Sequence, residues 1–360
     1  MEYGLSLLPD CDPDTASASR YFSDVLEASV LAETLGLGYV KMTEHYLSSY
    51  GGYCPSPLAF LSAVAARTRS VRLMTGGIQA SFHHPVQIAA QAAQLDVLSR
   101  GRLDVGFARA FLPYEFEAFG VDLDSSRERF VATIDAVVRL WTESDVSEET
   151  PFFRYAGANS LPMPVQQPAP PVWIAALATP ASFVWAAERG FNLLISSTQL
   201  TEMHRRREGI DLYRNTFLAK HGPAGRRPKV AVSIPLLIAD TDDEARDVAV
   251  PLMLKSFAAF KKAILSWENV ESPAYAGYTA MARQLASFDL AAEGLEAKAM
   301  VGSPDTVRGR LDEVRDVLDP DVVLWNVDFG GQSLDTMART LTLFADKVMP
   351  AGCPGGTMLG

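Results

Sequence analysis

Short apolar segments alternate with segments of helical length and periodicity from one end of the chain to the other. The apolar segments are rich in β-forming residues and are bounded by glycine, proline and polar clusters. They predict eight strands, at residues 3–8, 39–42, 71–76, 103–107, 172–175, 193–195, 230–238 and 322–327. The segments between them predict helices, among them residues 21–35, 86–98, 127–141 and 180–189.

The regular alternation of strand and helix favours a parallel sheet with crossover helices over separate α and β regions. Eight such units predict an α/β fold of the (β/α)8 TIM-barrel type, which keeps its chemistry in polar groups just after the strands. We expect residues 1–350 to form this one domain and residues 351–360 to be a disordered tail.

Two segments are longer than a tight barrel requires, and we expect both to be insertions at the barrel mouth. Residues 143–171 are rich in proline, whereas residues 261–300 carry Trp267, Tyr275, Tyr278 and Met281. The second insertion is either a lid over an apolar substrate or an aromatic part of the core. Small apolar residues on helix 86–98 also predict a homodimer contact, through Ile88, Ala89, Ala92 and Ala93.

Composition and charge limit the classes of partner that we expect this protein to bind. With 360 residues, of which 48% are hydrophobic, the chain can bury a large core. The formal net charge of -11 repels polyphosphate backbones and anionic lipid, so we expect neither nucleic acid nor membrane as a partner. The apolar runs fall short of the roughly 20 residues of a membrane span, and the three cysteines show no paired spacing. We expect a soluble, cytoplasmic protein.

Several catalytic motifs are missing from the sequence. It contains no G-x-S-x-G, H-E-x-x-H or C-x-x-C motif, and the pair Gly36 and Gly38 closes a helix instead of following a strand. Serine hydrolase, zinc hydrolase and Rossmann interpretations therefore lack support, and no metal site is predicted. We therefore expect catalysis by this protein to depend on a bound cofactor.

Polar residues follow three of the predicted strands. Glu44 and His45 follow strand 39–42, where an imidazole suits proton transfer, although it could also tie down its loop. Arg109 follows strand 103–107 and Arg127 begins a helix, so the two guanidinium groups could bind phosphate together. Thr179 and Ser182 at a helix start could join them, although capping and surface ion pairs explain each feature singly.

Gly76 and Gly77 end the third predicted strand. Glycine there either lets a flat ring system approach the backbone or forms a simple turn. The residues alone leave both interpretations of the glycine pair open.

The chain resembles the bacterial luciferase-like flavin monooxygenases nearly from end to end. The resemblance rests on motifs that occur in the family's order: Thr43-Glu44-His45-Tyr46, residues 80–86 (ASFHHPV), 98–102 (LSRGR), 106–109 (GFAR) and 343–350 (LFADKVMP). It implies a luciferase-like barrel that binds reduced FMN, supplied by a separate NAD(P)H:flavin reductase, with O2 as co-substrate. The implied reaction is insertion of one oxygen atom into an apolar, for example polycyclic, small-molecule substrate.

The resemblance also assigns residues. His45 matches the family's acid–base histidine, and Gly76-Gly77 matches a non-proline cis peptide under the flavin ring. The implied cofactor contacts are Gly76, Gly77, Arg109, Phe111, Arg127, Thr179, Ser182 and Ser196.

Two departures from the luciferases matter. Ala108 replaces their reactive cysteine and Tyr46 replaces a second histidine, so light-emitting aldehyde oxidation is not implied. A deazaflavin-dependent hydride-transfer enzyme and a non-catalytic flavin-binding partner subunit are the alternatives. His45, both arginines and the aromatic insertion argue against the subunit.

Overall fold

The computed structural model describes residues 1–11, 17–177, 179–195, 198–223, 227–287 and 294–350. Eight parallel strands close into a ring, because β9 pairs with β10 and β12 pairs with β1. Around the ring they are β1 (Glu2–Leu7), β2 (Tyr39–Met42), β3 (Arg72–Thr75), β5 (Leu103–Ala108), β8 (Val172–Ala175), β9 (Asn192–Ile195), β10 (Val230–Ile238) and β12 (Val322–Asn326). The predicted TIM barrel is confirmed, and its eight strands are the eight predicted from the sequence.

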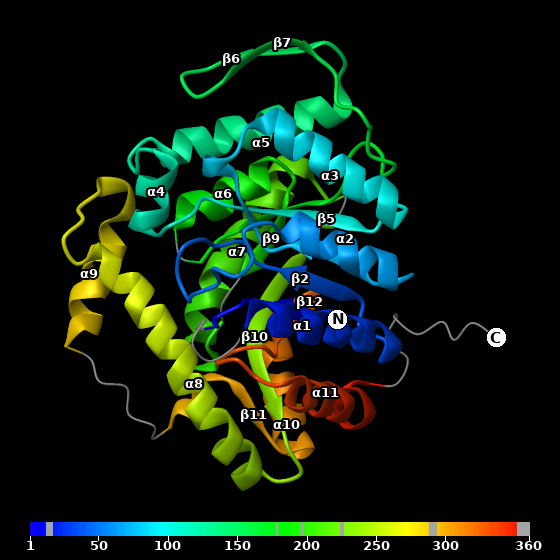
Figure 1. The fold of residues 1–360 in the computed structure, drawn as a ribbon, viewed down its shortest axis with the longest axis vertical. Coiled ribbons are helices and arrows are strands. Elements are labelled where there is room, and N and C mark those ends of the chain that lie inside the picture. The colour runs from blue at the N-terminus through cyan, green and yellow to red at the C-terminus, as the bar shows by residue number, and fades with distance from the viewer. Residues whose placement is uncertain (12–16, 178, 196–197, 224–226, 288–293, 351–360) are drawn as a thin grey trace.

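Helices surround this ring (Figure 1). In chain order they are α1 (Ala18–Thr34), α2 (Pro57–Arg67), α3 (Pro85–Ser99), α5 (Ser126–Thr142), α6 (Pro180–Glu188), α7 (Met203–His221), α10 (Pro304–Leu318) and α11 (Leu334–Leu343). The main hydrophobic core lies between these helices and the barrel. A second cluster fills the barrel interior, since its members come from six different strands: Tyr39, Met74, Trp173, Leu194, Ala231, Val322 and Leu324.

The remaining elements of the described residues are additions to the eight strands and eight helices of the barrel. They are β4 (Ile78–Gln79), β6 (Val146–Glu149), β7 (Arg154–Ala158), β11 (Met300–Gly302), α4 (Pro113–Phe119), α8 (Asp242–Ile264) and α9 (Ala276–Ala286), with 3-10 turns that include η3 (Leu265–Trp267) and η4 (Pro273–Tyr275). No helix in the described part of the chain is long and apolar enough to cross a membrane. The predicted tail at 351–360 lies outside the described residues.

Residues 143–171, expected to be an insertion at the barrel mouth, lie outside the helices instead of covering the mouth. Their antiparallel β6–β7 hairpin lies on the outer side of α3 and α5 (Figure 1), and the rings of Phe153 and Tyr155 lie 5.9 Å from the ring of His84. This segment connects the end of α5 to the start of β8. The hairpin thus runs along the outer side of these helices, and Phe153 and Tyr155 reach His84 at the N-terminus of α3.

The proposed dimer contact on α3 is also wrong. Ile88, Ala89, Ala92 and Ala93 are at most 3% exposed and pack within the main core. A helix that lies on a barrel needs small residues for close approach, so the same pattern serves the protein's own packing. The homodimer itself stays a prediction.

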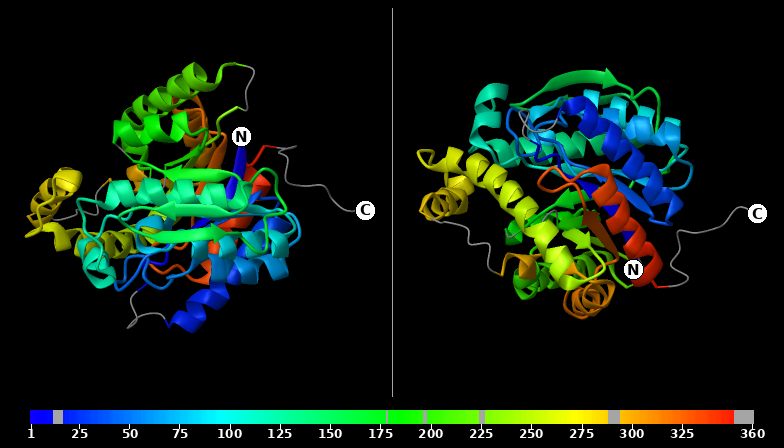
Figure 2. Two further views of the ribbon diagram at one scale, coloured as in Figure 1. Left: turned by 90° about the horizontal axis from the view of Figure 1, so that it is seen from above. Right: turned by 60° about the horizontal axis from the view of Figure 1, so that its bottom comes forward.

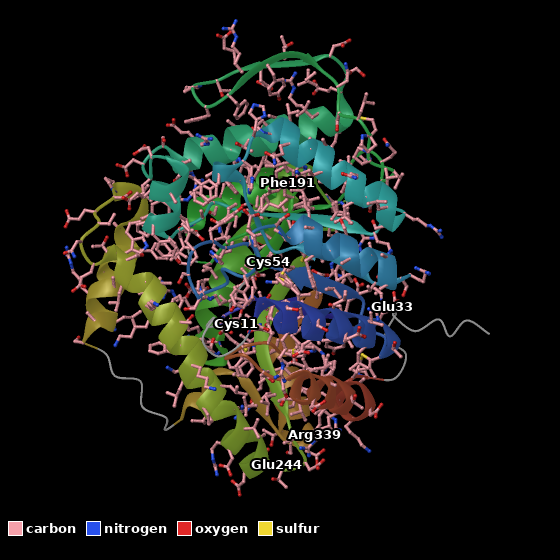
Figure 3. All side chains as sticks on the ribbon, viewed as in Figure 1. Cys11, Glu33, Cys54, Phe191, Glu244 and Arg339 are labelled. Atoms are coloured by element: carbon pink, nitrogen blue, oxygen red, sulfur yellow. The ribbon has the colours of Figure 1, made fainter. Side chains whose placement is uncertain are left out.

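Cys11 and Cys54 are buried, free thiols in the interior of the molecule (Figure 3). Burial raises the pKa of each thiol to about 12, so both are protonated at neutral pH. Low thiolate content makes these two cysteines poor nucleophiles.

Gly106 in β5 leaves no room for a side chain. A Cβ atom there would lie 2.1 Å from the Thr75 carbonyl oxygen, which belongs to the neighbouring strand. We expect Gly106→Ala to lower the free energy of unfolding by about 1–3 kcal/mol, because backbone must shift to admit the methyl group. Chemical denaturation measures this loss.

Gly309 offers a matched control within α10. A Cβ atom there meets nothing within 4 Å. Gly309→Ala is expected to raise the unfolding free energy by about 0.5–1 kcal/mol, because alanine is the better helix former. A Gly106→Ala variant as stable as the parent would contradict the close approach of β3 and β5.

Candidate active site

The loop after β2 places His45 in a buried hydrogen-bond network. His45 Nδ1 lies 3.1 Å from Glu115 Oε1, and the Tyr46 backbone N–H donates to the same oxygen at 2.8 Å. Both side chains are buried, with 6% of His45 and none of Glu115 exposed. A carboxylate at Nδ1 favours the tautomer that carries its hydrogen there, which leaves Nε2 available for proton transfer.

Gln79 completes this network from β4. Its amide nitrogen donates to the Glu44 carbonyl at 2.7 Å and lies 3.1 Å from His45 Nδ1. Glu115 and Gln79 were not found from the sequence, because they stand far from His45 along the chain and carry no motif. A buried glutamate in a helix directly after β5 is the signal that could have pointed to the pair.

Glu44 faces away from this pair. Glu44 Oε1 lies 2.7 Å from His83 Nε2 and accepts a hydrogen bond from the Tyr46 hydroxyl at 2.8 Å. Glu44 is only 2% exposed. Since Glu44 precedes His45 and Tyr46 follows it, the Tyr46–Glu44 hydrogen bond fixes the loop on both sides of His45. Glu44 is thus a structural neighbour of the site.

The structure brings together three of the residues that were predicted to bind phosphate. Arg109, Arg127 and Ser182 line one pocket, with Phe130, Val131, Ile174, Ala175 and Trp185. Burial and the neighbouring Arg109 cation both lower the pKa of Arg127. Two cations that share a partly buried pocket repel one another, and an anion between them removes that cost.

Of the other predicted cofactor contacts, Thr179 does not line this pocket. Thr179 is the N-cap residue of α6, with Pro180 in the first turn, but its side chain makes no capping hydrogen bond and it does not line the pocket. Ser196, the predicted ring contact, lies outside the described residues. The roles of Arg109, Arg127, Thr179, Ser182 and Ser196 toward a cofactor stay predictions.

The peptide bond between Gly76 and Gly77 is cis, as the resemblance predicted. A Cβ atom on Gly76 would lie 2.4 Å from the Lys41 side chain, and one on Gly77 would lie 2.7 Å from the Phe107 backbone. The protein's own packing therefore requires both glycines. Their contact with a flavin ring stays a prediction.

The aromatic insertion lies at the mouth, as predicted, and projects to one side of the barrel (Figure 2). The Phe111 ring stacks on Tyr278 at 5.2 Å and meets the His45 ring edge-on at 5.7 Å. Trp267 donates to the Phe111 carbonyl at 2.8 Å and is fully buried. The insertion is therefore both a core element and an aromatic wall beside His45.

The insertion also contacts Arg109. The Arg109 guanidinium lies 4.2 Å from the centre of the Tyr275 ring and donates to the Ala274 carbonyl at 3.1 Å. The same turn thus joins the aromatic wall to the cationic pocket.

The mouth fits a flat polar ring with a phosphate. Polar atoms without a hydrogen-bond partner among the described residues are buried on several sides of it: Gln79 Oε1, Glu115 Oε2, Thr198 Oγ1 and Ser233 Oγ. Buried polar groups normally find partners, so these four atoms are available to a polar ligand at the mouth. Ala108 at the end of β5 and Ala175 at the end of β8 are small side chains at this mouth, and Ala175 lines the cationic pocket.

Comparisons with known proteins agree with this arrangement. The sequence matches the model of the luciferase-like monooxygenase family over residues 1–319. It is 28% identical over 253 residues to the oxygenase component of a flavin-dependent trigonelline monooxygenase from Acinetobacter baylyi, with 69% of this chain and 68% of that protein covered.

Two further proteins are similar to this chain. An F420-dependent glucose-6-phosphate dehydrogenase from Amycolatopsis mediterranei is 30% identical over 196 residues, which is 52% of this chain and 58% of that protein. The solved structure of the monooxygenase RslO1 from Streptomyces bottropensis has a TM-score of 0.83 and 35% identity, and the match covers 97% of this chain and 98% of that one.

Proposed function

The chain belongs to the family of luciferase-like, flavin-dependent monooxygenases, and we propose that it is the oxygenase component of a two-component system. It would bind FMN that a separate NAD(P)H:flavin reductase has reduced, and use O2 to insert one oxygen atom into an apolar organic substrate. The relative from Acinetobacter baylyi, named as an oxygenase component, supports the division into two proteins. The 35% identity to a monooxygenase over nearly the whole chain supports oxygen insertion.

One observation carries this proposal: a cationic pocket and a buried imidazole–carboxylate pair lie at the same barrel mouth. Arg109 and Arg127 form the pocket after β5, and His45 with Glu115 forms the pair after β2. In the ring of strands, β3 with its glycine pair lies between β2 and β5. A ring over the glycines could therefore reach both groups.

Bound FMN would supply the electrons that activate O2, and the protein would position the reactants. Arg109 and Arg127 would hold the phosphate by charge-assisted hydrogen bonds, with donors from Ser182 and the start of α6. His45 Nε2 would move a proton at the substrate. The wall of Phe111 and Tyr278 would exclude water and present an apolar surface.

A deazaflavin-dependent hydride-transfer enzyme is the second candidate. The similarity to an F420-dependent dehydrogenase favours it, although that match covers only 52% of this chain. The same cationic pocket would hold the phosphate of a deazaflavin. The non-catalytic partner subunit is not favoured, because such a subunit does not need a buried His45–Glu115 pair.

An anaerobic titration distinguishes the two enzymes. The purified protein is mixed with reduced FMN and, separately, with reduced deazaflavin, and binding is followed by flavin fluorescence before air is admitted. We expect tight binding of reduced FMN and, with a panel of apolar substrates, oxygen from labelled O2 in the product. Binding of the deazaflavin alone, with no oxygen incorporated, would reject the monooxygenase in favour of the second candidate.

A further inference from the structure

Lys41 is a buried cation in the barrel that has no role in the proposed reaction described so far. It is the last but one residue of β2 and is only 1% exposed. Its neighbour two positions earlier, Tyr39, belongs to the cluster inside the barrel, so Lys41 faces the interior as well. The methylene groups of Lys41 lie against Gly76, where a Cβ atom would meet them at 2.4 Å. The side chain thus lies beside the glycine pair at the mouth.

The ammonium group of Lys41 has few partners. Its one hydrogen bond among the described residues goes to Thr43 Oγ1 at 3.3 Å, whereas an ammonium has three hydrogens to donate. Burial lowers the pKa of Lys41 to about 8, and the negative charge of Asp328 partly offsets this effect. The group is therefore still mostly charged at neutral pH.

Asp328 does not neutralise Lys41 by direct contact. No ion pair within 4.0 Å joins the two residues in the described chain. The Asp328 carboxylate instead accepts hydrogen bonds from the Leu8 backbone N–H at 3.0 Å, the Tyr21 hydroxyl at 2.8 Å and the Asn326 amide at 2.6 Å. A buried charge without a direct partner is costly, so the arrangement suits a protein that completes it with an anionic ligand.

We propose that the Lys41 ammonium binds the negatively charged edge of the reduced flavin ring and makes the protein prefer reduced over oxidised FMN. This inference rests on the proposed function. A reduced flavin that has lost its N1 proton carries negative charge over N1 and the C2 carbonyl, whereas the oxidised ring is neutral. A cation at that edge stabilises only the reduced form, so an oxygenase without its own reductase would capture the correct oxidation state.

The test is Lys41→Met, which keeps the length of the side chain and removes its charge. Affinities for reduced FMN, measured anaerobically, and for oxidised FMN are compared with those of the parent. We expect the affinity for reduced FMN to fall about tenfold and that for oxidised FMN to stay unchanged, the loss typical of one hydrogen bond to a charged group. The midpoint potential of bound FMN should then fall by about 30 mV, which is a tenfold change for a two-electron couple.

Lys229 provides a matched control, since its ammonium pairs with Glu2 at 2.9 Å, near the start of β1 and away from the mouth. Lys229→Met should leave the preference for reduced FMN intact. Lys41→Gln, which keeps a donor for Thr43, serves if Lys41→Met does not fold.

The outcomes separate this inference from the proposed function. A parent protein that binds FMN in neither state overturns both. An unchanged ratio of the two affinities in Lys41→Met, or an equal loss in both states, overturns only the role of Lys41.

Discussion

Replacement of His45 by alanine is expected to slow single-turnover substrate oxidation by about 10²–10⁴-fold while the affinity for reduced FMN stays nearly unchanged, the usual contribution of a general acid or base. The physical reason is the pair with Glu115, which holds Nδ1 at 3.1 Å and leaves Nε2 available. His45 does not line the cationic pocket, so its loss should spare phosphate binding. Anaerobic titration and single-turnover oxidation on the same variant measure the two effects.

Two further variants sharpen this test. Glu115→Gln should slow the same step less than His45→Ala, because the imidazole remains but loses the carboxylate that sets its tautomer. His84→Asn is the control, since His84 caps α3 by accepting from the Val86 N–H at 3.3 Å and asparagine retains a capping acceptor. An unchanged single-turnover rate in His45→Ala would end its assignment as a proton-transfer residue and leave it the role of tying down its loop.

Arg109→Ala is expected to weaken the binding of reduced FMN by about 1.5–3 kcal/mol, the range for a charge-assisted hydrogen bond. Arg109 shares its pocket with Arg127 and Ser182. Burial lowers the pKa of Arg127, and the positive charge of Arg109 lowers it further. Without Arg109 the pocket keeps one guanidinium, so binding should weaken and not vanish. Anaerobic titration with reduced FMN, at fixed ionic strength, measures the loss.

The control for Arg109 is an arginine outside the site. Arg67 pairs with Glu27 at 3.0 Å on the outer helices and is half exposed. Arg67→Ala should leave flavin affinity unchanged. Since Arg109 also stacks on Tyr275, thermal unfolding of both variants separates lost binding from a loosened insertion. If Arg109→Ala matched the parent in affinity, the phosphate site would have to lie elsewhere.

The strands were predictable because each strand of a closed parallel barrel is buried on both faces and so forms an apolar run. The strand predicted at 230–238 has the bounds observed for β10, and the one predicted at 39–42 has those of β2. The mouth was predictable for a related reason. Polar side chains that directly follow such an apolar run stand out from it, which made His45 and Arg109 visible as candidates.

The sequence did not identify Lys41 as a candidate. It stands in the middle of an apolar run, and its value as a cation depends on the distances to Thr43, Gly76 and Asp328. A sequence pattern cannot supply those distances, because the strands that carry them meet only when the barrel closes.

The sequence by itself determined the (β/α)8 barrel, the order of its strands and the residues at the strand ends, because burial and periodicity are local properties of the chain. The tertiary structure decided which of those residues meet: Glu115 reaches His45 across 70 positions of sequence. It also decided that the small residues of α3 face the protein's own barrel and that the β6–β7 hairpin packs outside α3 and α5. Those outcomes depend on how the barrel closes and on which elements pack against its outer side, and no local pattern of residues encodes either of them.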